Sequence, residues 1–179
     1  VDLASDLGIR IIQLAGYDVY YEEGSKATRA YFLDNLLASA EYAAKAGVLL
    51  GFETMETEFM DTVSKAMAYV RAVDSPYLGV YPDLGNLTNA ACKYGTSVAD
   101  DLESGRSHIV AMHLKETVPG KYREIPFGTG HVDFEAGVKK VRELGVRRFV
   151  AEMWYKGAQD WKDDIKAANK MLCGFLEEK

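Results

Sequence analysis

The stretch VLLGFE at positions 48–53 is an apolar run that ends abruptly in a carboxylic acid. Three later runs have the same form: GVYPD at 79–83, IVAMH at 109–113 and RRFVAE at 147–152. Strands that are apolar throughout are typical of parallel strands covered by helices. In a parallel β/α array, successive strand ends point to the same face. We therefore expect the four terminal side chains to gather there.

Helical periodicity alternates with apolar runs along the whole chain. We predict strands at 9–14, 48–53, 78–82, 109–114 and 148–152. A helix within an otherwise irregular stretch is expected near Val98 and Leu102. The other predicted helices are defined by apolar residues on one face: Leu33, Leu36, Leu37, Ala40, Ala43 and Ala44, capped by Ser25 and stopped by Gly47; Met60, Val63, Met67 and Val70, starting at Thr57 or Glu58; Phe134, Val138, Val141 and Leu144, stopped by Gly145; and Trp161, Ile165, Ala168, Leu172 and Phe175.

This order predicts an α/β fold in which each strand is followed by a helix or its remnant, with the period of a βαβ unit. A complete (β/α)8 TIM barrel takes about 250 residues. The 179 residues are therefore expected to form a single partial TIM-barrel domain over 1–179, an incomplete barrel of about the last five βα units. A doubly wound open sheet is the rival. It is disfavoured because LAGYDVYYEEG at 14–24 lacks the glycine-rich phosphate fingerprint.

The composition is that of a globular protein, with 48% apolar and 27% charged residues. A net charge of −6 without a basic cluster argues against nucleic acid or an anionic membrane as a partner. No apolar run approaches the length of a membrane span. The start VDLASDLGI has no signal-peptide pattern and no initiator Met, so we interpret it as an internal start. Cys92 and Cys173 favour a reducing, cytoplasmic compartment.

Glu53, Asp83, His113 and Glu152 form a set of three carboxylates and one imidazole at four strand ends. Some of them have ordinary explanations when taken alone: a helix cap for Glu53, a turn beside Pro82 for Asp83, and a satisfied core histidine for His113. A buried Glu152 needs a cation or a hydrogen-bond network. Together the four predict an oxygen and nitrogen site for Mn2+, Mg2+, Co2+ or Zn2+.

Further polar and aromatic residues follow the same strand ends. Lys115 shares a strand face with His113, where it either holds an anionic substrate or is solvated. The turn at 128–130 (Gly-Thr-Gly) either cradles a phosphate with its N–H groups or is a flexible surface loop. Trp154, after the last strand, either forms a wall of the substrate pocket or only packs against other aromatic residues. The candidate substrate-binding residues are Lys115, Asn86, Trp154 and His131.

Five motifs follow one another along the chain: GFETME, YPDLGN, HIVAMHLKE, IPFGTGHVDF and VAEMW. In this order they resemble the sugar-phosphate epimerases of the xylose-isomerase-like barrel superfamily. Within it, they are most similar to the 3-epimerases of L-ribulose 5-phosphate and L-xylulose 5-phosphate, which older naming calls hexulose-6-phosphate isomerases. The resemblance runs over essentially the whole chain.

The resemblance implies a divalent cation held by Glu53, Asp83, His113 and Glu152, with Glu53 and Glu152 also acting as the acid/base pair. The implied reaction is metal-dependent epimerisation at C3 of a ketopentose 5-phosphate through a cis-enediolate. Glu116 stands where the family pattern has Asp. Family members have about three further βα units before the first strand. We expect a small sugar phosphate as partner and a homodimer or larger homo-oligomer.

Three other functions stay open at this point. An aldose–ketose isomerase or a dehydratase could use the same metal site on the same scaffold. A metal-dependent DNA-repair endonuclease shares the superfamily but needs more histidine ligands and a basic face, whereas this chain has three histidines and a net charge of −6. A truncated, non-catalytic piece that keeps the scaffold is the third alternative.

Overall fold

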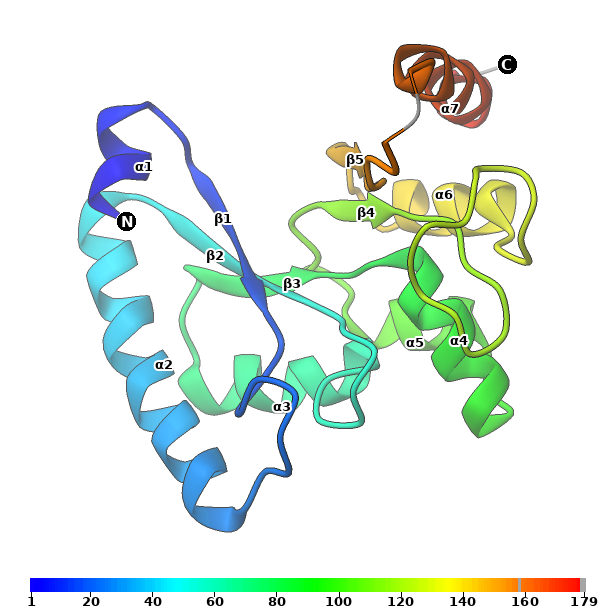
Figure 1. Cartoon of the computed structure of the whole chain (residues 1–179). Helices are drawn as coiled ribbons and strands as arrows, with labels where there is room; N and C mark the ends of the chain where they lie inside the picture. The colour runs from blue at the N-terminus through cyan, green and yellow to red at the C-terminus, as the bar shows by residue number, and fades with distance from the viewer. Residues whose placement is uncertain (158, 178–179) are drawn as a thin grey trace.

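The strands of this computed structural model, which describes residues 1–157 and 159–177, are parallel and form an open arc (Figure 1). Within these residues β1, β2 and β3 pair in that order, and β4 pairs with β5. Single bridges from Val80 to Ile109 and from Asp83 to His113 continue the arc from β3 to β4. The strands are β1 (Ile11–Ala15), β2 (Leu49–Glu53), β3 (Leu78–Tyr81), β4 (Met112–Leu114) and β5 (Phe149–Ala151).

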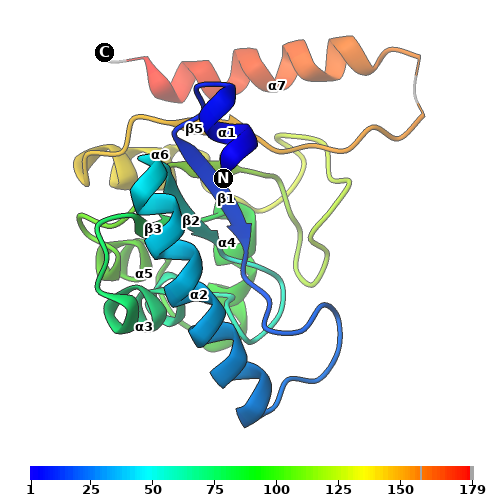
Figure 2. The same ribbon diagram turned by 90° about the vertical axis from the view of Figure 1, so that its left-hand side faces the viewer.

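Helices line the outer side of this arc and pack on one another in sequence, α2 on α3, α3 on α5, α5 on α6 and α6 on α7. Figure 2 shows α2 running along the sheet and α7 extending across the top of the molecule. No helix in the described part of the chain is both long and apolar enough to cross a lipid bilayer. The helices are α1 (Asp2–Asp6), α2 (Lys26–Ala46), α3 (Val63–Val73), α4 (Leu84–Tyr94), α5 (Val98–Ser104), α6 (Phe134–Glu143) and α7 (Trp161–Leu176).

Alternate residues of β2 face opposite sides of the arc, as the two-residue period of a strand requires. Leu50 and Phe52 are buried against the helices, and Phe52 stacks on Phe32 of α2 with 5.8 Å between ring centroids. Burial of such a side chain stabilises the fold by about 1.5–3 kcal/mol. Gly51 and Glu53 face the interior of the arc. The side chains of β2 that face the helices therefore form the core, and Glu53, on the opposite face of the strand, is placed to take part in a polar site.

The predicted ends of the long second helix are confirmed. The Ser25 side chain accepts the backbone N–H of Thr28 at 3.1 Å and so caps the first turn of α2. Gly47 ends the helix in the left-handed conformation, with φ of 66°, which glycine adopts without a steric penalty. The predicted strands also correspond to β1 to β5, although their ends are shifted.

The prediction that a helix starts at Thr57 or Glu58 is wrong, because α3 begins only after its N-cap Thr62. Met60 lies before that helix and is fully buried. Its carbonyl accepts the N–H of Met55 at 2.8 Å in a turn. Met60 is therefore apolar because this turn buries it in the core that α3 covers, and not because it belongs to the helix.

Two of the described helices, α1 and α4, were not predicted. Helix α4 begins directly after β3 with Asp83 as its N-cap, so the residue that suggested a turn in the sequence opens a helix. Gly85 and Asn86 lie in its first turn, and both have low helix propensity. Tertiary contacts at this end of the sheet outweigh that local preference.

The apolar face predicted for the last helix is only partly buried. Ala168 and Leu172 are buried, whereas Trp161 and Ile165 are 41% and 44% exposed. At the same end of the arc, Val150 of β5 is 47% exposed. β5, which carries Val150, is an edge strand among the described residues.

Gly79 lies where β3 closely approaches the segment before β4. A Cβ at this position in β3 would come within 2.5 Å of the His108 carbonyl oxygen. That carbonyl accepts the N–H of Val80 at 2.8 Å and links β3 to the segment before β4. We predict that Gly79→Ala lowers the free energy of unfolding by about 1–3 kcal/mol, because the backbone must shift. Urea unfolding followed by circular dichroism measures this change.

Gly174→Ala is the matched control. Gly174 lies in α7, and a Cβ added there meets nothing within 4 Å. Alanine should stabilise the helix at this position by about 0.5–1 kcal/mol. A Gly79→Ala protein as stable as the parent would show that the β3–β4 junction tolerates a side chain, against this prediction.

Candidate metal centre

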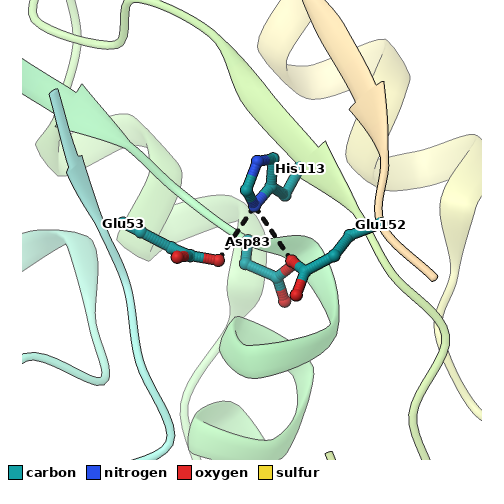
Figure 3. A group of neighbouring side chains, drawn as sticks. All are labelled: Glu53, Asp83, His113 and Glu152. Carbon is teal, nitrogen blue, oxygen red and sulfur yellow. Dashed lines mark hydrogen bonds and ion pairs between the residues drawn. The ribbon is translucent and has the colours of Figure 1, made fainter. Parts of the chain in front are cut away.

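Four side chains converge at the carboxyl ends of β2 to β5 (Figure 3). Glu53 is the last residue of β2, and Asp83 follows β3 as the N-cap of α4. His113 is the central residue of β4, and Glu152 directly follows β5. One candidate ligand atom from each lies within 4.8 Å of the others. The structure thus brings together all four residues that the sequence placed at strand ends.

The His113 ring points its Nδ1 atom into the cluster. Nδ1 lies 2.8 Å from Glu53 Oε1 and 2.9 Å from Glu152 Oε2. The contact with Glu53 has hydrogen-bond geometry, whereas Glu152 Oε2 has no hydrogen-bond partner among the described residues. The Tyr81 ring packs edge-on against the imidazole with 4.7 Å between ring centroids. Tyr81 therefore helps to hold the imidazole in the orientation that presents Nδ1.

Asp83 is fully buried and uses its two carboxylate oxygens differently. Oδ1 accepts the backbone N–H of Asn86 at 2.7 Å and thereby caps α4. The same oxygen lies 3.3 Å from Lys115 Nζ. Oδ2 is buried without a hydrogen-bond partner in the described part of the chain. Because an unsatisfied buried carboxylate oxygen is costly, Oδ2 is available to a cation.

The donor set fits a divalent cation. Asp83 Oδ2 and Glu152 Oε2, two buried carboxylate oxygens without hydrogen-bond partners among residues 1–157 and 159–177, belong to the same group as His113 and Glu53. Three carboxylates gathered in a largely buried site repel one another, and a doubly charged ion offsets that repulsion. Mixed oxygen and nitrogen ligands suit Mg2+, Mn2+, Co2+ and Zn2+. The cluster can therefore hold a divalent metal ion.

The pKa values in the cluster reflect this crowding. Burial alone would lower the pKa of His113, but the adjacent Glu152 and Glu53 carboxylates raise it to about 9. Burial raises the pKa of Asp83 against the opposing charge of Lys115, and the neighbouring Glu152 and Glu53 carboxylates raise it further. Burial would also raise the pKa of Glu152, but His113 and Lys115 together lower it. Protons and a bound cation would neutralise the same negative charge.

Lys115 and Trp154 lie beside the cluster. Lys115 is buried, not solvated, and its Nζ lies 3.7 Å from Glu152 Oε2 and 5.5 Å from the centroid of the Trp154 ring. The Arg123 guanidinium also approaches this ring, at 5.8 Å. Lys115 and Trp154 line a cavity of about 140 Å3 that Glu152 borders. Their position keeps both as candidate substrate contacts.

The other two candidate substrate contacts, Asn86 and His131, have protein partners of their own. Asn86 is buried, and its side-chain amide donates to the Thr54 carbonyl at 2.6 Å, so it links the end of β2 to α4. His131 Nε2 lies 3.1 Å from Thr117 Oγ1. Its ring borders a cavity between α4, α5 and α6, whereas the four-residue cluster lies at the strand ends.

The turn at 128–130 encloses a carboxylate of the protein itself. Glu116 is buried, and its Oε2 accepts the N–H of Gly128 at 3.0 Å. Its Oε1 accepts the N–H groups of Thr117 at 3.1 Å and Val132 at 3.2 Å. A Cβ on Gly130 would lie 2.3 Å from the same Oε1. The suggestion that this turn cradles a phosphate is therefore wrong for Gly128, whose N–H is already bonded.

Sequence reasoning missed two groups of neighbours. Gln13 of β1 donates its side-chain N–H to Glu53 Oε2. Its polarity within an otherwise apolar strand was the available signal. In the loop after β2, Glu56 accepts a hydrogen bond from the Tyr17 hydroxyl at 2.9 Å and pairs with Arg123 at 2.9 Å. These residues come from three different loops, so no local pattern joins them.

Comparison with known proteins gives a consistent family match. The model of the xylose isomerase-like TIM barrel family matches residues 1–173. L-ribulose-5-phosphate 3-epimerase UlaE of Shigella boydii serotype 18 is 42% identical over 161 residues, covering 89% of this chain and 55% of that protein. UlaE of Escherichia coli O139:H28 is 42% identical over 169 residues, covering 94% of this chain and 58% of that protein. This chain therefore spans little more than half the length of these relatives.

Solved structures share the fold at low sequence identity. A structure described as L-ribulose 3-epimerase superposes with a TM-score of 0.74 at 18% identity, covering 98% of this chain and 62% of that chain. A xylose isomerase domain protein from Planctomyces limnophilus superposes with a TM-score of 0.74 at 22% identity, covering 97% of this chain and 60% of that chain. These likenesses establish that the open arc is part of a TIM barrel.

Metal binding can be separated from helix capping at Asp83. Mn2+ or Mg2+ should raise the melting temperature of the protein, because a ligand that binds only the folded state stabilises it. Asp83→Asn should weaken binding by at least about tenfold while keeping the cap, since Asn caps helices as well as Asp does. Isothermal titration calorimetry measures the affinity. Asp133→Asn, the same change at the N-cap of α6, is the control and should bind normally.

Glu116 should hold the loop around it in place. Glu116→Gln replaces one acceptor oxygen by an N–H2 group that faces backbone donors. We predict that amide hydrogen exchange at Gly128 and Val132 becomes at least about tenfold faster, because a hydrogen bond to a charged group contributes about 1.5–3 kcal/mol. Mass-spectrometric exchange measures the rate. Glu124→Gln, at an exposed position of the same loop, should change nothing. Unchanged protection in Glu116→Gln would refute this role.

Proposed function

This chain belongs to the xylose isomerase-like TIM barrel family, and we propose that it catalyses metal-dependent epimerisation at C3 of a ketopentose 5-phosphate. The proposed substrates are L-ribulose 5-phosphate and L-xylulose 5-phosphate. The observation that carries the proposal is the pair of glutamates, Glu53 and Glu152, which approach His113 Nδ1 at 2.8 and 2.9 Å. The 42% identity to L-ribulose-5-phosphate 3-epimerases supports the choice of substrate.

Two carboxylates suit inversion at a carbon atom. One proton must leave one face of C3, and another must arrive at the opposite face. Glu53 extends from β2 and Glu152 from beyond β5, so the two carboxylates enter the cluster from opposite sides (Figure 3). In one direction Glu53 takes the C3 proton and the protonated Glu152 supplies the other. The roles reverse for the other epimer, and exchange with solvent resets both groups.

Removal of the C3 proton depends on the neighbouring carbonyl group at C2, which takes up the negative charge as an enediolate. The divalent cation that Glu53, Asp83, His113 and Glu152 would hold polarises this carbonyl when bound and thereby acidifies the C3 proton. Lys115 adds a fixed positive charge beside Asp83 and Glu152. A buried ammonium group at this point favours charge that develops on the substrate oxygens.

The cavity beside Glu152 offers a place for the sugar. It is lined by Lys115 and Trp154, which come from the loops after β4 and β5. We propose that Trp154 forms one wall of the substrate site and that Lys115 contacts a substrate oxygen. The partner is thus a small sugar phosphate. Nucleic acid is disfavoured as a ligand by the net charge of −6.

NMR-detected exchange of the C3 proton in D2O tests this function. The intact protein, supplied with Mn2+ or Mg2+, should incorporate deuterium at C3 of L-ribulose 5-phosphate and form the C3 epimer. Glu53→Gln and Glu152→Gln should each lower the rate of epimerisation by at least about 100-fold, since each removes an acid or base. Circular dichroism should report an unchanged fold.

Glu103→Gln is the control for these substitutions. Glu103 lies in α5, where it pairs with Arg106 and Lys140 on the surface, so the same chemical change should leave turnover intact. A fully active Glu152→Gln protein would refute the acid/base assignment. Formation of an aldose in place of the C3 epimer would instead indicate an aldose–ketose isomerase on the same scaffold.

A further inference from the structure

We propose that Gln13 is a positioning residue for Glu53 and orients the carboxylate that moves the C3 proton. This inference rests on the proposed epimerase function and deepens it. Gln13 lies on β1 and donates its side-chain N–H to Glu53 Oε2. The other oxygen, Oε1, contacts His113 Nδ1 at 2.8 Å. The plane of the Glu53 carboxylate is thus fixed by one neighbour at each oxygen.

The strand register explains why Gln13 can reach this carboxylate. Parallel pairing of β1 with β2 places Gln13 beside Gly51 and Ala15 beside Glu53. Residues two apart on a strand share a face, so Gln13 and Glu53 both point into the arc. Gly51 has no side chain to occupy the space between them. A long side chain at position 13 therefore extends along the strand direction to Glu53.

The two proposed proton-transfer groups differ in this respect. Both oxygens of Glu53 have polar neighbours, and Glu53 is buried. Glu152 Oε2 contacts His113 Nδ1 without hydrogen-bond geometry and has no hydrogen-bond partner among the described residues. Glu152 is also more exposed, with 24% of its side chain accessible compared with 8% for Glu53. Gln13 thus acts on one member of the pair, which predicts an asymmetric effect on the two directions of reaction.

A neutral amide is suited to this task. A carboxylate offers about four lone-pair directions, so an N–H from Gln13 occupies one and leaves others for the cluster and the substrate. A lysine at this position would add a second ion pair and hold the proton-accepting group more strongly in its charged form. An acid would repel Glu53. An amide donor fixes the orientation of the carboxylate without adding a charge to the site.

Gln13→Met tests the proposal, because it keeps the length of the side chain and removes the donor. In the intact protein we expect kcat to fall by about 10- to 100-fold, as misorientation of a reacting group does. KM and the Mn2+ affinity from calorimetry should each change by less than about threefold, because the four-residue cluster is untouched. Ile11→Met, on the same face of β1, is the control and should retain normal kcat.

Isotope effects supply a measurement that a purely structural role would not change. For the epimer whose C3 proton Glu53 removes, Gln13→Met should enlarge the primary deuterium isotope effect at C3. For the other epimer, Glu152 removes the C3 proton and Glu53 supplies the new one, and this second transfer becomes slow. The intermediate then returns to substrate more often. The rate at which solvent deuterium enters unreacted substrate should therefore rise relative to the rate of product formation. Gln13→Glu has the same shape as the native side chain, and we expect it to reduce kcat at least as much as Gln13→Met.

The outcomes separate this inference from the function on which it rests. Absence of C3 exchange in the unmodified protein with both epimers would overturn both. Normal turnover in the unmodified protein together with normal kcat in Gln13→Met would overturn the role of Gln13 alone. A loss of kcat that follows a matching loss of Mn2+ affinity would also overturn it, because Gln13 would then support the metal and not the orientation of the base.

Discussion

In-register parallel pairing of the strands is the constraint on which the site depends. Ala15 pairs with Glu53, and Glu53 pairs with Tyr81, so the carboxyl-terminal ends of neighbouring strands lie at one level of the arc. A slip of one residue in β2 would turn Glu53 toward the helices and bring Phe52 to the interior. Phe52 is buried among the helices, and its burial opposes that slip. Core packing thus sets the direction in which the ligand side chains point.

The sequence revealed the four cluster residues because each follows an apolar run, and strand ends in β/α units share a face. It did not reveal what surrounds them. Lys115 was equally compatible with solvent, and only the three-dimensional arrangement places its Nζ between Asp83 and Glu152. Glu116 bonds to backbone groups that lie far along the following loop, including Val132. Partners at such separations follow from the path of the loop, which no local pattern encodes.

Errors in predicting the helices had a similar origin. Propensity disfavours a helix with Gly85 in its first turn, yet α4 forms with the glycine at its second position. The structure gives the reason, because a Cβ at Gly85 would come within 2.6 Å of the Lys115 carbonyl oxygen. The glycine permits α4 to pack closely against the segment after β4, and this close approach brings Asp83 and Lys115 together. A residue that weakens the helix locally therefore helps to assemble the site.

Asp83 serves a helix with one oxygen and the cluster with the other, and this double use limits which amino acids evolution can place there. Glutamate would retain the negative charge but is not among the preferred N-cap residues, whereas Asn, Ser and Thr cap helices but carry no charge. Aspartate alone satisfies both requirements. A descendant that no longer needed the charge would be free to drift to Asn, Ser or Thr without losing α4. The residue at this position in a distant homologue would then record whether its lineage kept the chemistry or only the fold.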